Sequence, residues 1–229
     1  MIDKNGEETL ESMNQAAWFN QWTLNRFKSY LRGDILEVGC GIGNFTGTLA
    51  KYGKVWAIDI NESYIKELKT TDSQANVGVG NIEKGEYFFG NRKFDIAVCI
   101  NVLEHTENDN VALVNLYQLL KKGGRLILIV PSSPFLYGEI DRSIGHFRRY
   151  EKINLIKKLE DLDFKIIRSL RLNLLGAIGW FISGKIMKDT IVKKWKIKIF
   201  DFLARIVLPI EDFIEPPIGT SILIIAQKP

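Results

Sequence analysis

The sequence predicts an α/β protein with a doubly wound, mostly parallel sheet and helices on both faces. In the first half of the 229 residues, short apolar runs alternate with segments of helical spacing. Three glycines at alternate positions follow the first apolar run, as at a sharp strand-to-helix turn. With 46% hydrophobic residues at this length, the chain is expected to fold as a single domain over 1–229.

The elements are expected in the following order. An amphipathic helix over 14–31 ends before Gly33 and forms a helical cover within 1–32. The alternating part has strands at 35–38, 54–59, 76–79, 94–99 and 124–130 and helices at 44–52, 62–69 and 108–120. Basic residues and glycines at 121–124 are expected to end the last of these helices. A helix at 151–161, strands at 164–172 and 219–227, and a helical insertion at 174–213 between the last two strands complete the chain.

The glycines point to a ligand that carries a ribose. They are Gly39, Gly41 and Gly43, and Asp59 ends the next expected strand, 20 residues after Gly39. Ligands bind at the carboxyl ends of parallel strands, where a carboxylate can accept both hydroxyl protons of a ribose. The structural alternatives are an ordinary strand-to-helix turn for the glycines and a helix cap for Asp59.

Two features separate the possible cofactors. The glycines are spaced GxGxG, whereas a dinucleotide fingerprint has its third glycine one place later. Glu37, just before the loop, would repel a pyrophosphate but would attract a ligand that bears an ammonium group. A nicotinamide-dependent oxidoreductase is therefore the alternative enzyme rather than the expected one.

Four segments in order resemble the class I S-adenosylmethionine-dependent methyltransferases over roughly 14–135. They are I-L-E-V-G-C-G-I-G-N-F-T, W-A-I-D-I-N, F-D-I-A-V-C-I-N-V-L-E-H and L-K-K-G-G-R-L-I-L-I-V-P. The resemblance implies a seven-stranded sheet whose last strand is antiparallel, with S-adenosylmethionine as cofactor. It places the following residues at that cofactor: Glu37, Gly39, Cys40, Gly41 and Gly43 at the glycine loop, Asp59 at the ribose, Ile60, Asn81 and Ile82 at the adenine, and Asn101 after the fourth expected strand. Many members have aspartate where this chain has Asn81, whose amide oxygen can still accept from the adenine amino group.

Two histidines are the expected catalytic residues. Methyl transfer from a sulfonium requires alignment, exclusion of water and, for some acceptors, removal of a proton. His105 follows the fourth expected strand, and His146 lies in D-R-S-I-G-H-F-R-R-Y, at 141–150. An imidazole changes charge near neutral pH and so can serve as the base. The alternative is that Glu104 and His105 only fix their loop.

The expected substrate-binding residues are Trp18, Trp22, Arg142, Arg148, Arg149 and Tyr150. The arginines could bind an acidic acceptor through a bidentate fork. Alternatively, they pair with Asp141, Glu139 and Glu151 in a structural lid, and the tryptophans only pack on the sheet edge. The segment 141–150 is similar to bacterial methyltransferases linked to cell-surface polysaccharide and lipid synthesis. The expected acceptor is an oxygen, or less readily a nitrogen, of a small or lipid-linked molecule, which could be a sugar or an acid.

Composition limits the remaining partners. A net charge of +4, spread along most of the chain, gives no reason to expect a nucleic-acid partner. Cys40 and Cys99 suit reduced thiols, no metal-ligand spacing is present, and neither a secretory signal nor an uninterrupted apolar span is expected. These features predict a cytoplasmic protein without a metal.

The insertion 174–213 contains basic amphipathic helices, which could contact the inner face of a membrane, cover the sheet or form a dimer interface. A non-catalytic module binding a membrane surface or a partner is the alternative from another class.

Overall fold

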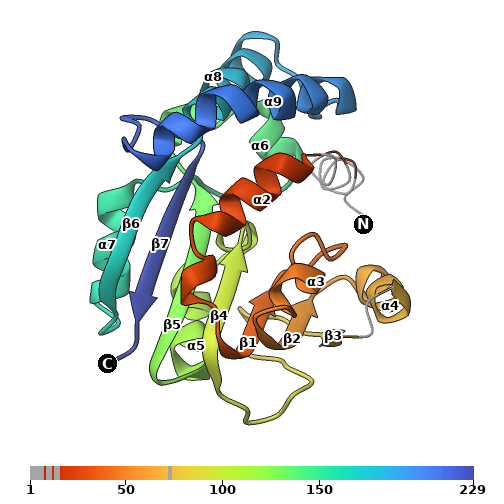
Figure 1. The fold of residues 1–229 in the computed structure, drawn as a ribbon, viewed down its shortest axis with the longest axis vertical. Coiled ribbons are helices and arrows are strands. Elements are labelled where there is room, and N and C mark those ends of the chain that lie inside the picture. The colour runs from red at the N-terminus through yellow and green to blue at the C-terminus, as the bar shows by residue number, and fades with distance from the viewer. Residues whose placement is uncertain (1–7, 9–11, 13–15, 72–73) are drawn as a thin grey trace.

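The computed structural model describes residues 8, 12, 16–71 and 74–229, so most of 1–15, including the start of the helix expected at 14–31, lies outside the described residues. One sheet contains all seven described strands (Figure 1). They are β1(Gly33–Val38), β2(Gly53–Asp59), β3(Ala75–Val79), β4(Phe94–Ile100), β5(Leu120–Pro131), β6(Lys165–Leu172) and β7(Ser221–Gln227). The order is β3-β2-β1-β4-β5-β7-β6, with β7 antiparallel to both of its neighbours. The expected fold class is confirmed.

Both faces of the sheet are covered, because successive strand residues point to opposite sides. Ile35 lies in one core cluster and Leu36 in the other. Helices α5(Asp109–Leu119) and α7(Lys152–Glu160) cover the face of Leu36. The face of Ile35 packs against α2(Ala17–Asn25), α3(Thr46–Leu49) and α4(Glu62–Thr71). Short turns η1(Lys28–Tyr30), η2(Leu103–His105) and η3(Pro134–Leu136), together with α6(Glu139–Ser143), connect these elements.

Three expected boundaries were wrong. The helix expected to run to residue 31 ends at Asn25, and the short turn η1 follows it. The helix expected at 44–52 is only the four residues of α3. The segment 121–124 does not close a helix, since α5 ends at Leu119 and β5 begins at Leu120. Phe94 pairs with Leu120 and Ile96 with Arg125, so 121–124 forms an irregular bulge within the strand. Lys121 bonds Asp95 of β4 at 2.9 Å, which ties this bulge to the neighbouring strand.

The helical insertion lies between β6 and β7, as expected. It consists of α8(Leu174–Trp180), the π-helical turn η4(Phe181–Ile186), α9(Lys194–Val207) and η5(Leu208–Asp212). Figure 1 shows α8 and α9 lying across the end of the sheet at which β4 and β5 finish, with α2 beside them. The amide of Phe19 donates to Asp201 of α9 at 3.0 Å, and the indole of Trp22 donates to Asp212 at 3.2 Å. Within the part of the chain that is described, no helix is long and apolar enough to span a bilayer.

Candidate functional site

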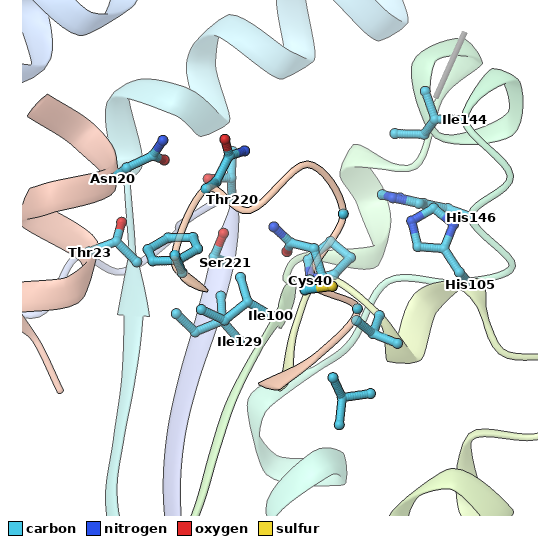
Figure 2. A pocket seen from close by; sticks show the side chains of 18 of the residues that line it. Asn20, Thr23, Cys40, Ile100, His105, Ile129, Ile144, His146, Thr220 and Ser221 are labelled. Atoms are coloured by element: carbon cyan, nitrogen blue, oxygen red, sulfur yellow. The ribbon is translucent and has the colours of Figure 1, made fainter. Parts of the chain in front are cut away.

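A cavity of about 630 Å³ lies at the carboxyl ends of β1, β2 and β4 and beneath the helical insertion. Parallel sheets place their ligand sites at this edge, because the loops that leave the strands converge there. The loops after these strands form one side of the cavity, and α2, α8 and α9 form the other. The volume is in the range of small-molecule and cofactor sites. Figure 2 shows part of its lining, with the two histidines side by side.

The glycine loop after β1 is fixed by packing as well as by backbone conformation. Gly39 has φ +73°, and a Cβ there would lie 2.3 Å from a methyl group of Val102, in the loop after β4. A Cβ at Gly43 would lie 2.5 Å from Leu68 of α4. Gly39 and Gly41 line the cavity, whereas Gly43 is not part of the lining formed by the described residues. Gly43 therefore serves the packing of the loop on α4.

Asp59 organises the loop and keeps hydrogen-bonding capacity for a ligand. Its Oδ2 accepts from the amide of Gly41 at 2.8 Å, and its Oδ1 accepts from the amide of Asn61 at 2.9 Å. Burial raises the pKa of Asp59, while these hydrogen bonds oppose the shift. A carboxylate has about four lone-pair positions, so each oxygen can accept one more donor. Asn61, whose Oδ1 accepts from the amide of Ser63, is the residue that caps α4, so the cap alternative for Asp59 does not apply.

The neighbours of Asp59 suit a ribose that carries a flat base. Ile60 is 70% exposed and lines the cavity, an unusual position for a large apolar side chain unless something packs on it. Ile82 is buried and also belongs to the lining. Asn81 lines the cavity too, but its side-chain oxygen accepts from the amides of Glu83 at 2.9 Å and Lys84 at 3.1 Å. These two bonds compete with the expected acceptor role of this oxygen toward adenine, which stays a prediction.

The side of the loop nearest β1 carries negative charge. Glu37 is buried, lines the cavity and accepts from the hydroxyl of Thr46 at 2.6 Å. Cys40 is a buried free thiol, and burial together with Glu37 and Asp59 raises its pKa. It therefore stays a neutral lining residue. Asn101, which has φ +53° at the end of β4, completes the part of the cavity that the sequence assigned to the cofactor.

His105 and His146 meet in the wall of the same cavity. His105 belongs to η2, directly after β4, and His146 belongs to the loop after α6. Their ring centroids are 4.7 Å apart and the rings are nearly perpendicular. Both rings line the cavity (Figure 2). The structure thus brings together the two histidines that the sequence proposed as catalytic.

A buried carboxylate orients His146. Nδ1 of His146 lies 2.9 Å from Oδ1 of Asp141, which also accepts from Nε of Arg149 at 2.8 Å. The other oxygen of Asp141 accepts from the indole of Trp180 at 3.0 Å. Burial would raise the pKa of Asp141, but the bonds from His146, Arg149 and Trp180 outweigh it and lower the pKa. Because the carboxylate can only accept, Nδ1 carries the proton and Nε2 of the neutral ring is left as the acceptor.

Glu104 is a third titratable group beside the histidines. Its side chain is fully buried, and neither carboxyl oxygen has a hydrogen-bond partner among the described residues. Burial raises the pKa of Glu104 to about 8. Its Oε1 lies 3.8 Å from Nε2 of His146. Ligand atoms of Glu104, His105 and His146 lie within 4.8 Å of one another, so these three side chains could hold a metal ion. The absence of a metal stays a prediction from the sequence.

Replacing Glu104 by glutamine is expected to change how stability depends on pH. Since the folded pKa is about 8 and the ordinary value is 4.5, the folded protein keeps a proton that the unfolded chain loses. The free energy of unfolding of the wild type therefore falls as pH rises through this window. Glutamine removes that fall, which is on the order of 5 kcal/mol over the full window. Denaturant titrations at acidic and alkaline pH measure it, with the exposed Glu107→Gln as control. If the free energies of unfolding of E104Q and the wild type differed by the same amount at all pH values, the raised pKa of Glu104 would be contradicted.

Several expected substrate residues lie away from the cavity that the described residues form. Arg142 pairs with Glu139, and Arg148 pairs with Asp109 at 3.3 Å. Trp18 stacks on Trp22, and the hydroxyl of Tyr150 donates to Asp109. These four residues are not part of the lining formed by the described residues, and their role in substrate binding stays a prediction. The lining does contain Trp22 and Arg149. Arg149 is nevertheless committed to Asp141 and to the carbonyl of Ser132, as in the structural alternative.

Other lining residues were missed from the sequence. Polar groups come from α2 and from the start of β7, and apolar groups come from α6 and its following loop. They include Asn20, Thr23, Thr220, Ser221, Ile140 and Ile144 (Figure 2 labels all but Ile140). No local motif marks them, because they meet only when β7 inserts between β5 and β6. The one sequence signal was the aromatic, polar character of the helix that carries Asn20.

Comparison with known proteins shows that the central part of the chain is similar to a known protein family. Residues 36–128 match the family described as "Methyltransferase domain". A protein from Methanocaldococcus jannaschii, described as uncharacterized, is 29% identical over 173 residues, 76% of this chain and 72% of that protein. A ubiquinone biosynthesis O-methyltransferase from Rickettsia canadensis is 33% identical over 97 residues, 42% of this chain. The match covers only 41% of the length of that relative.

Solved structures bear out the fold. The crystal structure of a SAM-dependent methyltransferase from Archaeoglobus fulgidus is 19% identical and superposes with a TM-score of 0.63. The match covers 93% of this chain and 94% of that chain. Residues 36–128 are therefore similar to a methyltransferase domain, and the chain has the Rossmann-like fold of a solved methyltransferase. Both findings support the enzyme class expected from the sequence.

Proposed function

We propose that the protein transfers a methyl group from S-adenosylmethionine to a hydroxyl oxygen of an acceptor with an apolar portion. The observation that carries this proposal is that one cavity is lined both by a ribose-type carboxylate and by a carboxylate-oriented histidine. Asp59 and the exposed Ile60 mark the cofactor part. His146, held by Asp141 at 2.9 Å, marks the acceptor part. The methyltransferase domain matched over 36–128 contains all of the cofactor part.

The residues in the cofactor part fit S-adenosylmethionine. When bound, this cofactor supplies a methyl group activated by a sulfonium. The two remaining lone-pair positions of Asp59 suit the ribose hydroxyls, and Ile60 and Ile82 suit the adenine. Glu37, next to the loop, complements an ammonium group. The loop after β1 binds and orients the cofactor, and the helical insertion limits access of water.

His146 is the proposed base. Its Nδ1 is engaged by Asp141, so its Nε2 can accept the proton that a hydroxyl loses when it is methylated. His105, whose ring lies against His146 and lines the cavity, positions the acceptor. Oxygen is favoured over nitrogen, since an uncharged hydroxyl needs such a base. The Rickettsia canadensis relative, named for O-methylation, agrees with this choice.

The lining supports an acceptor that is partly apolar. Ile100, Ile129, Ile140 and Ile144 line the cavity, and so does Phe200 of the insertion. The three arginines that could have bound an acid have partners within the protein. A lipid-linked hydroxyl compound, as used in cell-surface synthesis, fits this lining better than a small acid or a free sugar.

Calorimetry and a transfer assay test the proposal together. S-adenosylmethionine and its demethylated product are expected to bind, whereas NAD is expected not to bind, because Glu37 and the GxGxG loop disfavour a pyrophosphate. Incubation with labelled S-adenosylmethionine and lipid-linked hydroxyl compounds is expected to label the acceptor. Binding of NAD in place of S-adenosylmethionine would favour an oxidoreductase. Cofactor binding without transfer to hydroxyl, amine or sugar acceptors would favour a non-catalytic module.

A further inference from the structure

Helix α9 is apolar on two opposite sides. Its inner side, with Ile197 and Ala204, is buried against the rest of the protein. Its outer side carries Trp195, Ile199, Phe202 and Ile206, which are between 52% and 66% exposed. These four follow the i, i+4, i+7, i+11 spacing of one helical stripe. A helix that only covers a sheet needs no second apolar stripe, so the outer side requires its own explanation.

The stripe continues beyond the helix. The turn η5 follows α9 directly and exposes Ile210, and the residues after it expose Phe213 and Ile214. Phe213 is 89% exposed, close to the exposure of an unfolded chain. Single exposed apolar side chains are ordinary, but a contiguous series of this length marks a contact site. We call this series, with the outer side of α9, the outer apolar face.

The charges around the outer apolar face are positive. Lys194, Lys198 and Arg205 lie together along one edge of the stripe by helical spacing. The single acid of α9, Asp201, is buried and accepts from the amide of Phe19 and from Arg205. The acids of η5 are also engaged. Glu211 accepts from the amides of Asn173 and Leu174, and Asp212 pairs with Arg26.

We propose that the outer apolar face docks on an anionic lipid surface. An apolar stripe containing tryptophan and phenylalanine, bordered by cations, is the pattern of a helix that lies in the membrane interface. Anionic headgroups attract each basic side chain near the surface. If two copies of this chain met through this face, the cations of one copy would repel the same cations of the other. Charge complementarity therefore favours an anionic lipid surface over self-association.

Docking there would place the cavity directly beneath the lipid. Ile197 and Phe200, on the inner side of α9, belong to the cavity lining. Figure 1 shows α9 in the outermost layer, on the far side of α2 and of the sheet end. An acceptor that resides in the membrane would then have a short route into the cavity. The docking itself does not depend on the proposed reaction and can be tested without it.

Co-sedimentation of the full chain with vesicles tests the inference. Vesicles of phosphatidylcholine with phosphatidylglycerol are expected to bind the protein, and added salt is expected to weaken the binding. Vesicles of phosphatidylcholine alone are expected to bind much more weakly. Ile206→Asp should weaken binding about tenfold, since it places a charge in the apolar stripe. The matched control is Ile153→Asp on α7, which is 72% exposed and lies outside the face. It should bind as the wild type does.

A second pair of variants probes the charge without touching the apolar stripe. Lys198→Glu is expected to weaken binding about tenfold by reversing one charge, whereas Lys157→Glu on α7 is expected to have no effect. Equal binding of I206D and the wild type would overturn the inference. So would equal binding to neutral and anionic vesicles. Concentration-dependent dimers in sedimentation velocity that I206D abolishes, without vesicle binding, would assign the face to a second copy and overturn the proposal as well.

Discussion

Replacing Asp59 by alanine is expected to weaken the binding of S-adenosylmethionine by about 100-fold, because two hydrogen bonds to a charged acceptor are lost. The same change removes the acceptor for the amides of Gly41 and Asn61, which loosens the loop after β1. Calorimetry with S-adenosylmethionine measures the loss. The affinity of the wild type should also fall as pH is lowered, since burial raises the pKa of Asp59 and the protonated carboxyl accepts fewer donors.

The matched control is Asp161→Ala, which removes an exposed aspartate at the end of α7. Its affinity for S-adenosylmethionine should stay within about twofold of the wild type, since surface substitutions change little. Asp59→Asn keeps an acceptor oxygen, so its affinity for S-adenosylmethionine is expected to lie between those of D59A and the wild type. If D59A bound S-adenosylmethionine as tightly as the wild type, the cofactor would not lie at the carboxyl end of β2.

Much of the fold follows from local patterns in the sequence. Apolar runs separated by helical segments predict buried parallel strands, since such strands are covered on both faces. The pattern fails where a distant partner decides. Residues 121–124 have the glycine and lysine content of a helix end, yet β4 pairs with Leu120 and Arg125 on either side of them, and Lys121 bonds Asp95. The α9 segment has apolar residues on two sides, so periodicity indicates a helix without saying that Ile197 and Ala204 pack inward.

The candidate site divides in the same way. Asp59 and the glycine loop could be placed from the sequence, because strand ends of a parallel sheet converge on one edge. The partner of Arg148 could not be predicted from the sequence. Asp109 lies 39 residues earlier and comes close only because α5 packs beside the loop before α7. Thr220 and Ser221 join the cavity because β7 runs antiparallel between β5 and β6. The sequence patterns do not reveal contacts between residues that are brought together only by the folding of distant segments.

Replacing His146 by alanine is expected to lower kcat by about 1000-fold, the usual range for losing a general base. The dissociation constant for S-adenosylmethionine should change little, because the proposed cofactor contacts come from the loop after β1 and from Asp59. The fold should persist, since Asp141 keeps its bonds to Arg149 and to Trp180. Single-turnover transfer and calorimetry on the same preparation separate the two effects, and added imidazole should restore part of the rate.

Asp141 is a positioning residue, and its replacement distinguishes orientation from proton transfer. Asp141→Asn can donate to Nδ1 of His146 and so favours the tautomer in which Nε2 carries the proton. We expect kcat to fall with little change in KM, and the dependence of kcat on pH to shift, which a purely structural loss would not cause. His105→Ala, by contrast, should raise KM for the acceptor more than it lowers kcat, since its proposed role is to position the acceptor. Full turnover in H146A, or equal effects of H105A and H146A on kcat, would assign the proton to another group. Glu104 is then the next candidate, because Nε2 of His146 lies 3.8 Å from its Oε1 and burial raises its pKa to about 8.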